Sequence, residues 1–413
     1  MSLVSPRIGA VAALCALVGV ATGVSSSSAA TGGAPIRLGI TASVGNPVAD
    51  YPRLFAGARA AARSINAHGG IGGRPLEILT CNNHGDGVQE VACARKLIGH
   101  GVVAMVGSYV YADDADYERT LSDAGVADLG PVGPDTPSYA GTQAFPLQFS
   151  PGGWVACLAP TLLRTLGVTT VAIVRAATPS SDPLAQLVKN AIDRLGLKLV
   201  ADIQIPETAT DYRPFARQAA EAGAGLVVGQ IAPPAIQAFV GAARRLGHRY
   251  AFCELNDVAV PDQTWLPLGP LATGIYVGSL TPPLTEEARL PLLRQFVADM
   301  KAELAAGDTD ANISVAKYTD HALQAWLAVQ AVLQVAPSIH GELTRRSLLA
   351  ALQHARVDLG GIFPPIDFDH SKFAGPYQHV YNWVGVVWHW DPKQRNYFLV
   401  PHSRFDVAKA AFG

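Results

Sequence analysis

The 413-residue sequence has few charged side chains, and the two signs nearly cancel. Charged residues make up 15% of the chain, with 31 Lys and Arg against 33 Asp and Glu and a formal net charge of -2. A protein that binds a polyanion normally carries a basic excess or a basic stripe, so no nucleic-acid partner is expected. Hydrophobic residues, at 49%, are plentiful enough for burial. At this length two lobes are expected rather than one large core.

Common catalytic motifs are also absent. The sequence contains no Gly-x-Ser-x-Gly nucleophile elbow, no Walker A loop and no His-Glu-x-x-His. Ser314-Val-Ala-Lys317 matches the Ser-x-x-Lys pair of penicillin-recognising enzymes, but neither Ser-Asp-Asn nor Lys-Thr-Gly accompanies it. An acyl hydrolase using Ser314 and Lys317 is kept as a remote alternative, and an exposed helix start explains the same residues. We therefore predict that the protein is not an enzyme.

The first 30 residues have the features of an export signal. Arg7 supplies a weak positive start, residues 8–20 are apolar, and Ser28-Ala-Ala30 offers small residues for cleavage after Ala30. The apolar run is too short for a membrane span. Leu14 before Cys15 is a poor match to a lipobox, so we predict a signal peptide over residues 1–30 and an exported protein.

Cysteine is scarce, with five residues, and removal of the leader would leave four. An even number in an exported chain indicates disulfides. Cys81 ends a predicted strand and Cys93 lies on the following helix, which favours a bridge between them. Cys157 and Cys253 would pair or stay free. Because no CxxC or HxxxH spacing is present, no zinc site is predicted.

Asn82-Asn-His-Gly-Asp86 mixes a histidine with a carboxylate. Its spacing matches no ligand pattern, and polar turn residues between a strand and a helix explain it better. We therefore predict no metal site, and no cofactor is expected.

Short apolar runs alternate with amphipathic stretches along most of the chain. This order of strand and helix predicts parallel sheets with helices on both faces and right-handed crossovers. The segment Phe149-Ser-Pro-Gly-Gly-Trp154 breaks the rhythm and predicts a crossing into a second lobe. Strands are expected at residues 36–40, 76–80, 102–106, 126–129, 169–174, 197–203, 225–229, 249–253 and 274–279, and helices at 52–68, 88–98, 113–124, 183–195, 212–222, 233–246, 285–304 and 314–335.

The glycines of residues 69–73 follow a predicted helix and precede a predicted strand. In a dinucleotide-binding loop the glycines follow a strand and open a helix, so that backbone N–H groups meet a pyrophosphate. The order here is reversed, which predicts a helix stop without ligand chemistry of its own.

The segment at residues 65–73 also resembles a known protein family. A helix ending Ile65-Asn-Ala-x-Gly-Gly-Ile-x-Gly73 and leading into a strand closely resembles the first αβ unit of periplasmic solute-binding proteins of the branched-chain amino acid (Leu/Ile/Val-binding) family. Tyr318-Thr-Asp-His-Ala322 and Pro365-Ile-Asp-Phe368 resemble later parts of it. The resemblance implies the type I periplasmic-binding fold, an α/β architecture of two doubly wound parallel-sheet lobes joined by a multi-strand hinge. We expect lobe 1 at residues 36–150 plus 279–358, and lobe 2 at 151–278 plus 359–413.

In open α/β sheets the ligand lies outside the carboxyl ends of the strands. Two such lobes facing each other would line one cleft with these edges. The loops that follow the predicted strands supply the candidate ligand-binding residues Ser43, Tyr51, Ser108, Tyr109, Asp135, Thr136, Ser180, Glu254 and Asp257.

The resemblance also implies roles. The loops of Ser108 to Tyr109 and of Asp135 to Thr136 would hold a ligand's carboxylate and amino group, and a carboxylate of the loop at 254–257 would face its ammonium. Helix capping by Ser108 and turn formation by Asp257 are the structural alternatives.

The sequence departs from the family at one place. Many amino-acid binders carry a Tyr-Gly pair after the first strand of the second lobe, whereas Val174-Arg-Ala-Ala-Thr-Pro-Ser-Ser181 has neither residue. Tyr109, Tyr111 or Trp154 would have to replace that aromatic wall, and each also suits simple packing.

The expected function is that of an exported, monomeric solute-binding protein, periplasmic or associated with the cell envelope. It would capture a small polar ligand, an amino acid or a related amide or carboxylate, in the interlobe cleft and deliver it to an ABC permease. Contacts made only in the closed form would shift the hinge equilibrium. An extracytoplasmic ligand sensor with the same fold is the alternative.

Overall fold

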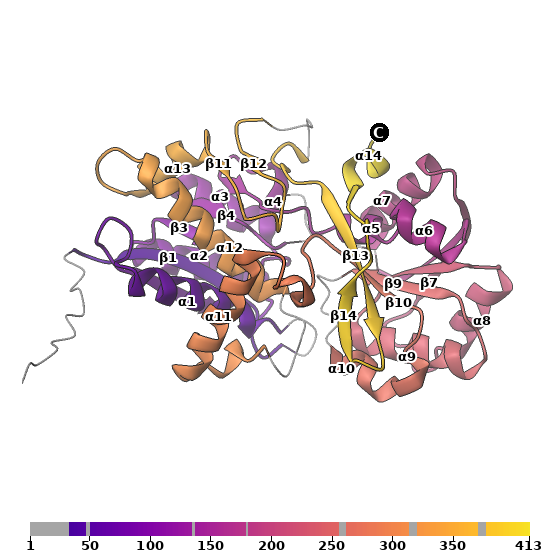
Figure 1. Cartoon of the computed structure of the whole chain (residues 1–413). Helices are drawn as coiled ribbons and strands as arrows, with labels where there is room; N and C mark the ends of the chain where they lie inside the picture. The colour runs from indigo at the N-terminus through magenta and orange to yellow at the C-terminus, as the bar shows by residue number, and fades with distance from the viewer. Residues whose placement is uncertain are drawn as a thin grey trace, which may run out of the picture.

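The computed structural model describes residues 33–46, 50–133, 137–178, 181–255, 262–313, 320–370 and 377–413. The predicted signal peptide and the Ser314–Lys317 pair lie outside these residues. Two α/β lobes, each built on its own sheet, lie side by side and are joined by strands and connecting segments (Figure 1). The predicted fold class is confirmed. No helix in the described part of the chain is long and apolar enough to span a bilayer.

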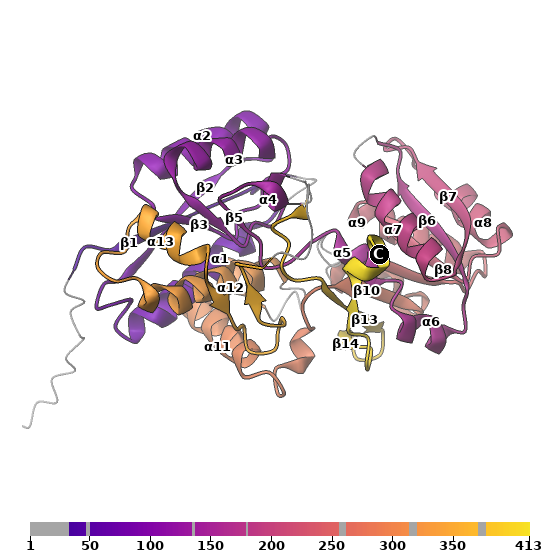
Figure 2. The ribbon, with the colours of Figure 1, turned by 90° about the horizontal axis from the view of Figure 1, so that it is seen from above.

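The first sheet has the strand order β2-β1-β3-β4-β5, and all of its pairings are parallel. Helices α2 and α3 cover one face, and α1, α11 and α12 cover the other (Figure 2). The strands are β1 (Ile36–Ala42), β2 (Leu76–Asn82), β3 (Ala104–Val106), β4 (Ala127–Leu129) and β5 (Ala144–Phe145). The helices that connect them are α1 (Pro52–Ala67), α2 (Gly87–Gly99), α3 (Asp114–Ala124) and α4 (Pro137–Ala140).

The helix stop predicted at residues 69–73 is confirmed. Helix α1 ends at Ala67 and strand β2 begins at Leu76, with Gly69 and Gly70 at φ values of 97° and 74°. The Gly70 N–H donates to the Ile65 carbonyl at 3.0 Å, which satisfies an end carbonyl of the helix. A Cβ at Gly70 would lie 2.0 Å from the Arg74 carbonyl oxygen, so only glycine fits this turn.

Later parts of the chain return to the first lobe. These are the short 3-10 turns η3 (Leu284–Glu286), η4 (Thr309–Ala311) and η5 (Ala336–Ser338), the helices α11 (Pro291–Ala305), α12 (Asp320–Val335) and α13 (Arg345–Leu352), and the paired strands β11 (Arg356–Val357) and β12 (Ile366–Asp367). Helix α12 packs closely against α1, since a Cβ at Gly57 of α1 would lie 2.1 Å from the Ala322 carbonyl oxygen of α12. The helix expected over 285–304 is shorter than predicted: it begins only at Pro291, because proline suits the first helical turn and breaks a helix interior.

The second sheet has the order β14-β13-β10-β9-β8-β6-β7, with β15 paired to β13. Strands β6 to β10 run parallel, and β13 and β14 form an antiparallel hairpin on β10. The strands are β6 (Thr170–Ala176), β7 (Lys198–Ile205), β8 (Leu226–Gln230), β9 (Ala251–Leu255), β10 (Ile275–Ser279), β13 (Val384–Asp391), β14 (Asn396–Leu399) and β15 (Phe405–Asp406). The helices are α5 (Gly152–Ala156), α6 (Pro160–Leu166), α7 (Ser181–Arg194), α8 (Arg213–Glu221), α9 (Pro233–Arg245), α10 (Asp262–Trp265), the 3-10 segment η2 (Leu266–Leu271) and α14 (Val407–Ala411).

The chain leaves the first lobe after β5, returns after β10, and leaves again between β12 and β13. The sequence-based division placed residues 359–413 in lobe 2. In the structure, however, the apolar side chains of residues 359–368 pack in the core of the first sheet, among them Leu359, Phe363 and Phe368. We propose that the last boundary lies after Phe368.

Two disulfides are present. Cys81 and Cys93 join β2 to α2 with a Cα–Cα distance of 5.6 Å, as predicted. Cys157 and Cys253, whose state the sequence left open, are bonded as well and join the end of α5 to β9.

Candidate functional site

Four of the predicted residues come together at the carboxyl edge of the first sheet. Ser43 directly follows β1, and its carbonyl oxygen accepts a hydrogen bond from the Tyr51 N–H at 2.8 Å. The Tyr109 N–H donates to the Thr41 carbonyl at 2.9 Å, which joins the loop after β3 to the end of β1. The rings of Tyr51 and Tyr109 then lie 4.4 Å apart between centroids. The neighbouring ends of β1 and β3 therefore position Ser43, Tyr51, Ser108 and Tyr109 together.

Two further rings extend this pair into an aromatic cluster of Tyr51, Tyr109, Tyr111 and His321. The His321 ring lies 4.6 Å from Tyr51 and 5.8 Å from Tyr109, and Tyr111 lies 5.6 Å from Tyr109. His321 comes from α12, far along the chain. The segment containing His321 carries no predicted site role, because only the tertiary fold brings α12 beside α1 and β3.

The two serines of this edge have different surroundings. The Ser108 hydroxyl is buried and accepts a hydrogen bond from the Thr41 N–H at 3.2 Å, so it helps to join β1 to the β3 loop. The Ser43 hydroxyl is equally buried but has no hydrogen-bond partner among the residues that the structure describes. Buried polar groups are usually paired, so Ser43 is the better candidate for a ligand contact through its side chain.

A buried glutamate of α2 fixes the aromatic loop. The Glu90 carboxylate accepts hydrogen bonds from three consecutive backbone N–H groups, those of Tyr111 at 3.0 Å, Ala112 at 3.2 Å and Asp113 at 2.7 Å. Sequence reasoning missed this residue, since a glutamate in an amphipathic helix normally faces solvent. The binding of the loop by Glu90 therefore determines where Tyr111 lies.

The start of α3 does not favour an anionic ligand. Asp113 caps the helix by accepting from the Asp116 N–H, and Asp114 and Asp116 lie in the first turn. These side chains already complement the positive end of the helix dipole. The attraction that a helix N-terminus has for an anionic group is therefore offset here by three aspartates.

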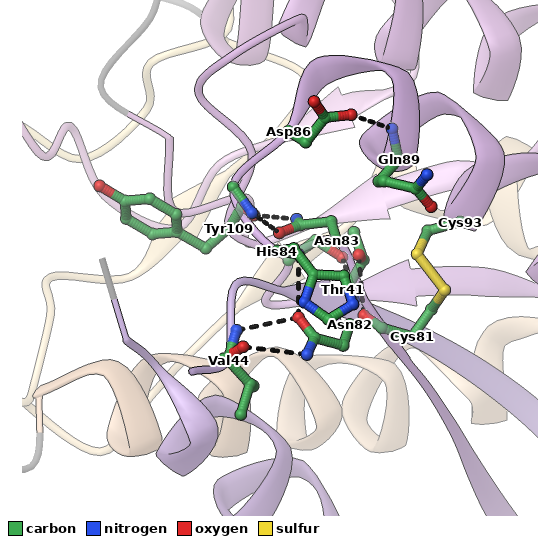
Figure 3. Close-up of a disulfide and its surroundings, with 12 residues drawn as sticks. Thr41, Val44, Cys81, Asn82, Asn83, His84, Asp86, Gln89, Cys93 and Tyr109 are labelled. Carbon is green, nitrogen blue, oxygen red and sulfur yellow. Dashed lines mark hydrogen bonds between the residues drawn. A yellow bond between two sulfur atoms is a disulfide. The ribbon is translucent and has the colours of Figure 1, made fainter. Parts of the chain in front are cut away.

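The Asn82-to-Asp86 segment has structural partners (Figure 3). The Asn82 side chain accepts from the Val44 N–H at 2.9 Å and donates to the Val44 carbonyl at 3.0 Å, while Asn83 donates to the Tyr109 carbonyl at 3.1 Å. Asp86 caps α2 by accepting from the Gln89 N–H. These contacts support the interpretation of the segment as a turn that joins three loops. Within the described ranges, no group of three or more His, Cys, Asp or Glu side chains is arranged to hold a metal ion.

A buried pair of carboxyl groups lies beneath this edge, between β4 and α3. Burial raises the pKa of Asp128 to about 7, and burial together with the charges of Asp128 and Asp114 raises the pKa of Glu118 well above its usual range. Interaction between the two carboxyls raises the pKa of Glu118 further and lowers that of Asp128, so Glu118 holds its proton more firmly than Asp128 does. Tyr117 faces the same cluster and is fully buried, which raises its pKa as well.

In the second lobe, Glu254 lies near the carboxyl end of β9 and is fully buried. Its Oε1 accepts a hydrogen bond from the Trp154 indole N–H at 2.8 Å. Its Oε2 lies over β8, where a Cβ at Gly229 would approach it to 2.4 Å. Trp154, which the sequence analysis considered as a replacement aromatic wall, therefore orients the predicted carboxylate.

Arg175 occupies the region where the family's Tyr-Gly pair is missing. Its buried guanidinium donates to both carboxylate oxygens of Asp202, to Asp182 at 2.6 Å and to the Ser181 hydroxyl at 2.8 Å. Burial alone would raise the pKa of Asp202, but the hydrogen bonds from Arg175 and Lys189 lower it overall. Arg175 is thus held in an ion-pair network inside the second lobe.

Four predicted site residues, Asp135, Thr136, Ser180 and Asp257, lie outside the described residues. Among the others, Ser43, Tyr51, Ser108 and Tyr109 meet at one sheet edge, and Glu254 lies at the corresponding edge of the other sheet.

Comparison with known protein families assigns the chain to one of them. Residues 35–381 match the profile of the family described as Periplasmic binding protein. The chain belongs to this family. Periplasmic binding proteins are a family of solute-binding folds rather than of enzymes.

Curated relatives of this periplasmic binding protein include Leu/Ile/Val-binding protein homolog 3 of Brucella melitensis, 25% identical over 197 residues that cover 47% of this chain and 54% of the relative. The Leu/Ile/Val-binding protein of Escherichia coli strain K12 is 30% identical over 98 residues, 24% of this chain and 27% of the relative. The match thus spans about half the length of the Brucella relative and less of the E. coli relative.

Solved structures resemble this periplasmic binding protein over most of its length. A substrate-binding protein of Aeropyrum pernix superposes with a TM-score of 0.72 at 15% identity, covering 92% of this chain and 100% of that one. LivJ of Streptococcus pneumoniae, solved with isoleucine, superposes with a TM-score of 0.65 at 16% identity, covering 89% of this chain and 99% of that one. A fatty acid ABC transporter substrate-binding protein of Thermomonospora curvata superposes with a TM-score of 0.71 at 16% identity, covering 91% of this chain and 94% of that one. These similarities establish the fold alone, and their different ligands show that the fold does not determine ligand class.

Proposed function

We propose that the chain is an exported solute-binding protein that captures a small polar ligand between its lobes and delivers it to an ABC permease. The observation that carries the proposal is the placement of polar and aromatic side chains at the carboxyl ends of the parallel strands in both sheets. The ligand is an amino acid or a related amide or carboxylate, and the protein acts as a monomer outside the cytoplasm. The two disulfides accord with an oxidising compartment.

Glu254 is the proposed contact for the ligand's ammonium group. A buried carboxylate attracts a cationic group strongly, because the surrounding protein screens its charge less than water does. The Trp154 N–H already holds Oε1, which fixes the orientation of the carboxylate before the ligand arrives. A preformed acceptor of this kind reduces the ordering that binding requires.

The aromatic cluster of the first lobe supplies the second half of the site. Tyr51 and Tyr109 offer ring faces for the apolar part of a ligand, and aromatic faces also attract ammonium groups. The Ser43 hydroxyl adds a donor and an acceptor at the same edge. A ligand that contacts both lobes stabilises the closed form and so shifts the hinge equilibrium.

The proposal is tested by thermal shift against a panel of amino acids and small amides and carboxylates. One chemical class should raise the melting temperature in proportion to its affinity and concentration. Calorimetry on Glu254→Gln should then show at least a tenfold loss of affinity for an amine-bearing ligand, since hydrogen bonds to charged groups contribute about 1.5–3 kcal/mol.

The matched control is Glu77→Gln, which changes an exposed glutamate of β2 paired with Arg37. Its affinity should equal that of the wild type. If no member of the panel binds, the assignment as a solute-binding protein for this ligand class is wrong. If Glu254→Gln and Glu77→Gln bind equally well, the ligand contact of Glu254 is wrong while the solute-binding role stands.

A further inference from the structure

Gln230 is an anomaly of the second lobe. It is the last residue of β8 and lies at the carboxyl end of that strand, in register with Arg175 of β6. Only 6% of the residue is exposed, yet neither the amide nitrogen nor the amide oxygen has a hydrogen-bond partner among the described residues. Leu226 and Val228, which point to the same face of the strand, are buried apolar residues. An aliphatic side chain at position 230 would continue this row.

The polar neighbour of Gln230 on β6 is engaged elsewhere. Arg175, its register partner, directs its guanidinium to Asp202, Asp182 and Ser181. Glu254 of the next strand lies level with Gly229, so its side chain faces the other side of the sheet. Burying an unpaired amide costs about 1–3 kcal/mol per unsatisfied group, so such residues in native proteins call for an explanation. A bound ligand that pairs with the amide of Gln230 would provide this explanation.

We propose that Gln230 determines ligand specificity by pairing with a carboxamide or urea group of the bound ligand. The inference rests on the proposed function, because it assigns the ligand to the carboxyl edge of the second sheet. Gln230 offers one acceptor oxygen and one NH2 donor in a single plane. A carboxamide or a urea presents the complementary acceptor and donor side by side, so both amide atoms become paired.

Other ligand groups would leave part of Gln230 unpaired. A carboxylate accepts from the NH2 group but gives nothing to the amide oxygen, and an ammonium does the reverse. An aliphatic side chain satisfies neither atom. Sites built to hydrogen-bond a ligand reject analogues that lack the matching group far more strongly than apolar pockets discriminate by size. The geometry therefore favours an amide-bearing ligand over a branched-chain aliphatic one.

The test uses calorimetry of the intact protein with ligands of similar shape, asparagine against leucine and glutamine against methionine, and with acetamide and urea as minimal probes. At least one amide should bind at least tenfold more tightly than its apolar counterpart. Gln230→Leu should lower the affinity for that amide at least tenfold and reduce the preference. Gln186→Leu, an exposed change on α7, should leave both affinities unchanged.

A second measurement separates recognition from a structural role. Without ligand, Gln230→Leu should raise the melting temperature, because it replaces an unpaired buried amide with an aliphatic side chain. A lowered melting temperature would show that Gln230 stabilises the fold and would overturn the proposal. Tighter binding of leucine or methionine than of the amides, unchanged in Gln230→Leu, would overturn it and leave the solute-binding role intact. If none of these compounds binds either protein, the amide assignment is wrong, and the rest of the panel decides the solute-binding role.

Discussion

The buried carboxyl pair predicts that Asp128→Asn makes the protein more stable at neutral pH. Asp128 lies within β4, fully buried against Glu118 of α3, and Asp114 and Tyr117 of the same helix face the cluster. Burial disfavours the charged carboxylate, so the folded protein keeps a proton that the unfolded chain releases. The amide in the variant has no proton to lose and stays neutral across this pH range.

The size and sign of the effect follow from the pKa of Asp128. It rises from 3.8 to about 7 on folding, so the wild type has its full stability below pH 4 and loses stability as the pH rises through 7. The total decrease in the free energy of unfolding is roughly 4 kcal/mol, at about 1.4 kcal/mol for each unit by which the pKa is raised. Between pH 5 and pH 8 the variant should gain about 2.5 kcal/mol relative to the wild type.

Urea unfolding at pH 5, 6, 7 and 8 measures this difference directly. Asp123→Asn, an exposed change on α3, serves as the control and should run parallel to the wild type. Parallel curves for Asp128→Asn and the wild type would refute the reasoning, because they would mean that Asp128 is ionised in the folded protein at every pH tested.

The remaining predictions concern the aromatic loop and the second disulfide. Glu90→Ala should lower the free energy of unfolding in urea by about 3 kcal/mol, because it leaves the half-buried N–H groups of Tyr111 and Asp113 unpaired. The same change should weaken ligand binding. Unchanged stability would contradict that role of Glu90. Replacing Cys157 and Cys253 together by alanine should lower the free energy of unfolding by about 4–5 kcal/mol, since the bridge joins residues that are 96 positions apart in the sequence. A loss below about 1 kcal/mol would exclude a large contribution from this bridge.

The order of helices and strands could be predicted from the sequence because it follows from the local spacing of apolar residues. The turn at residues 69–73 was predictable for the same reason, since glycine conformation and helix ending are local properties. Cys81 and Cys93 also lie close in sequence, which made their pairing inferable. The helix start at Pro291 was missed because apolar residues continue upstream through the 3-10 turn at Leu284–Glu286.

The candidate site was less predictable because its contacts join distant segments. The side chain of Glu90 binds N–H groups 21 to 23 residues away, and a glutamate in a helical pattern gives no sign of this. His321 reaches Tyr51 only because α12 packs on α1. Gln230 directly follows the strand predicted at residues 225–229, but its unpaired amide is a property of the packed lobe.

The second disulfide links the candidate site to the compartment where the protein folds. Cys253 immediately precedes Glu254, and Cys157 lies three residues after Trp154, so the bridge holds together the two segments that form the Glu254–Trp154 hydrogen bond. Oxidation of the bridge and formation of the Glu254–Trp154 hydrogen bond, which orients the proposed ammonium contact, are therefore expected to occur together. A chain kept in the reducing cytoplasm would lack this constraint, and we expect it to acquire full affinity only after export.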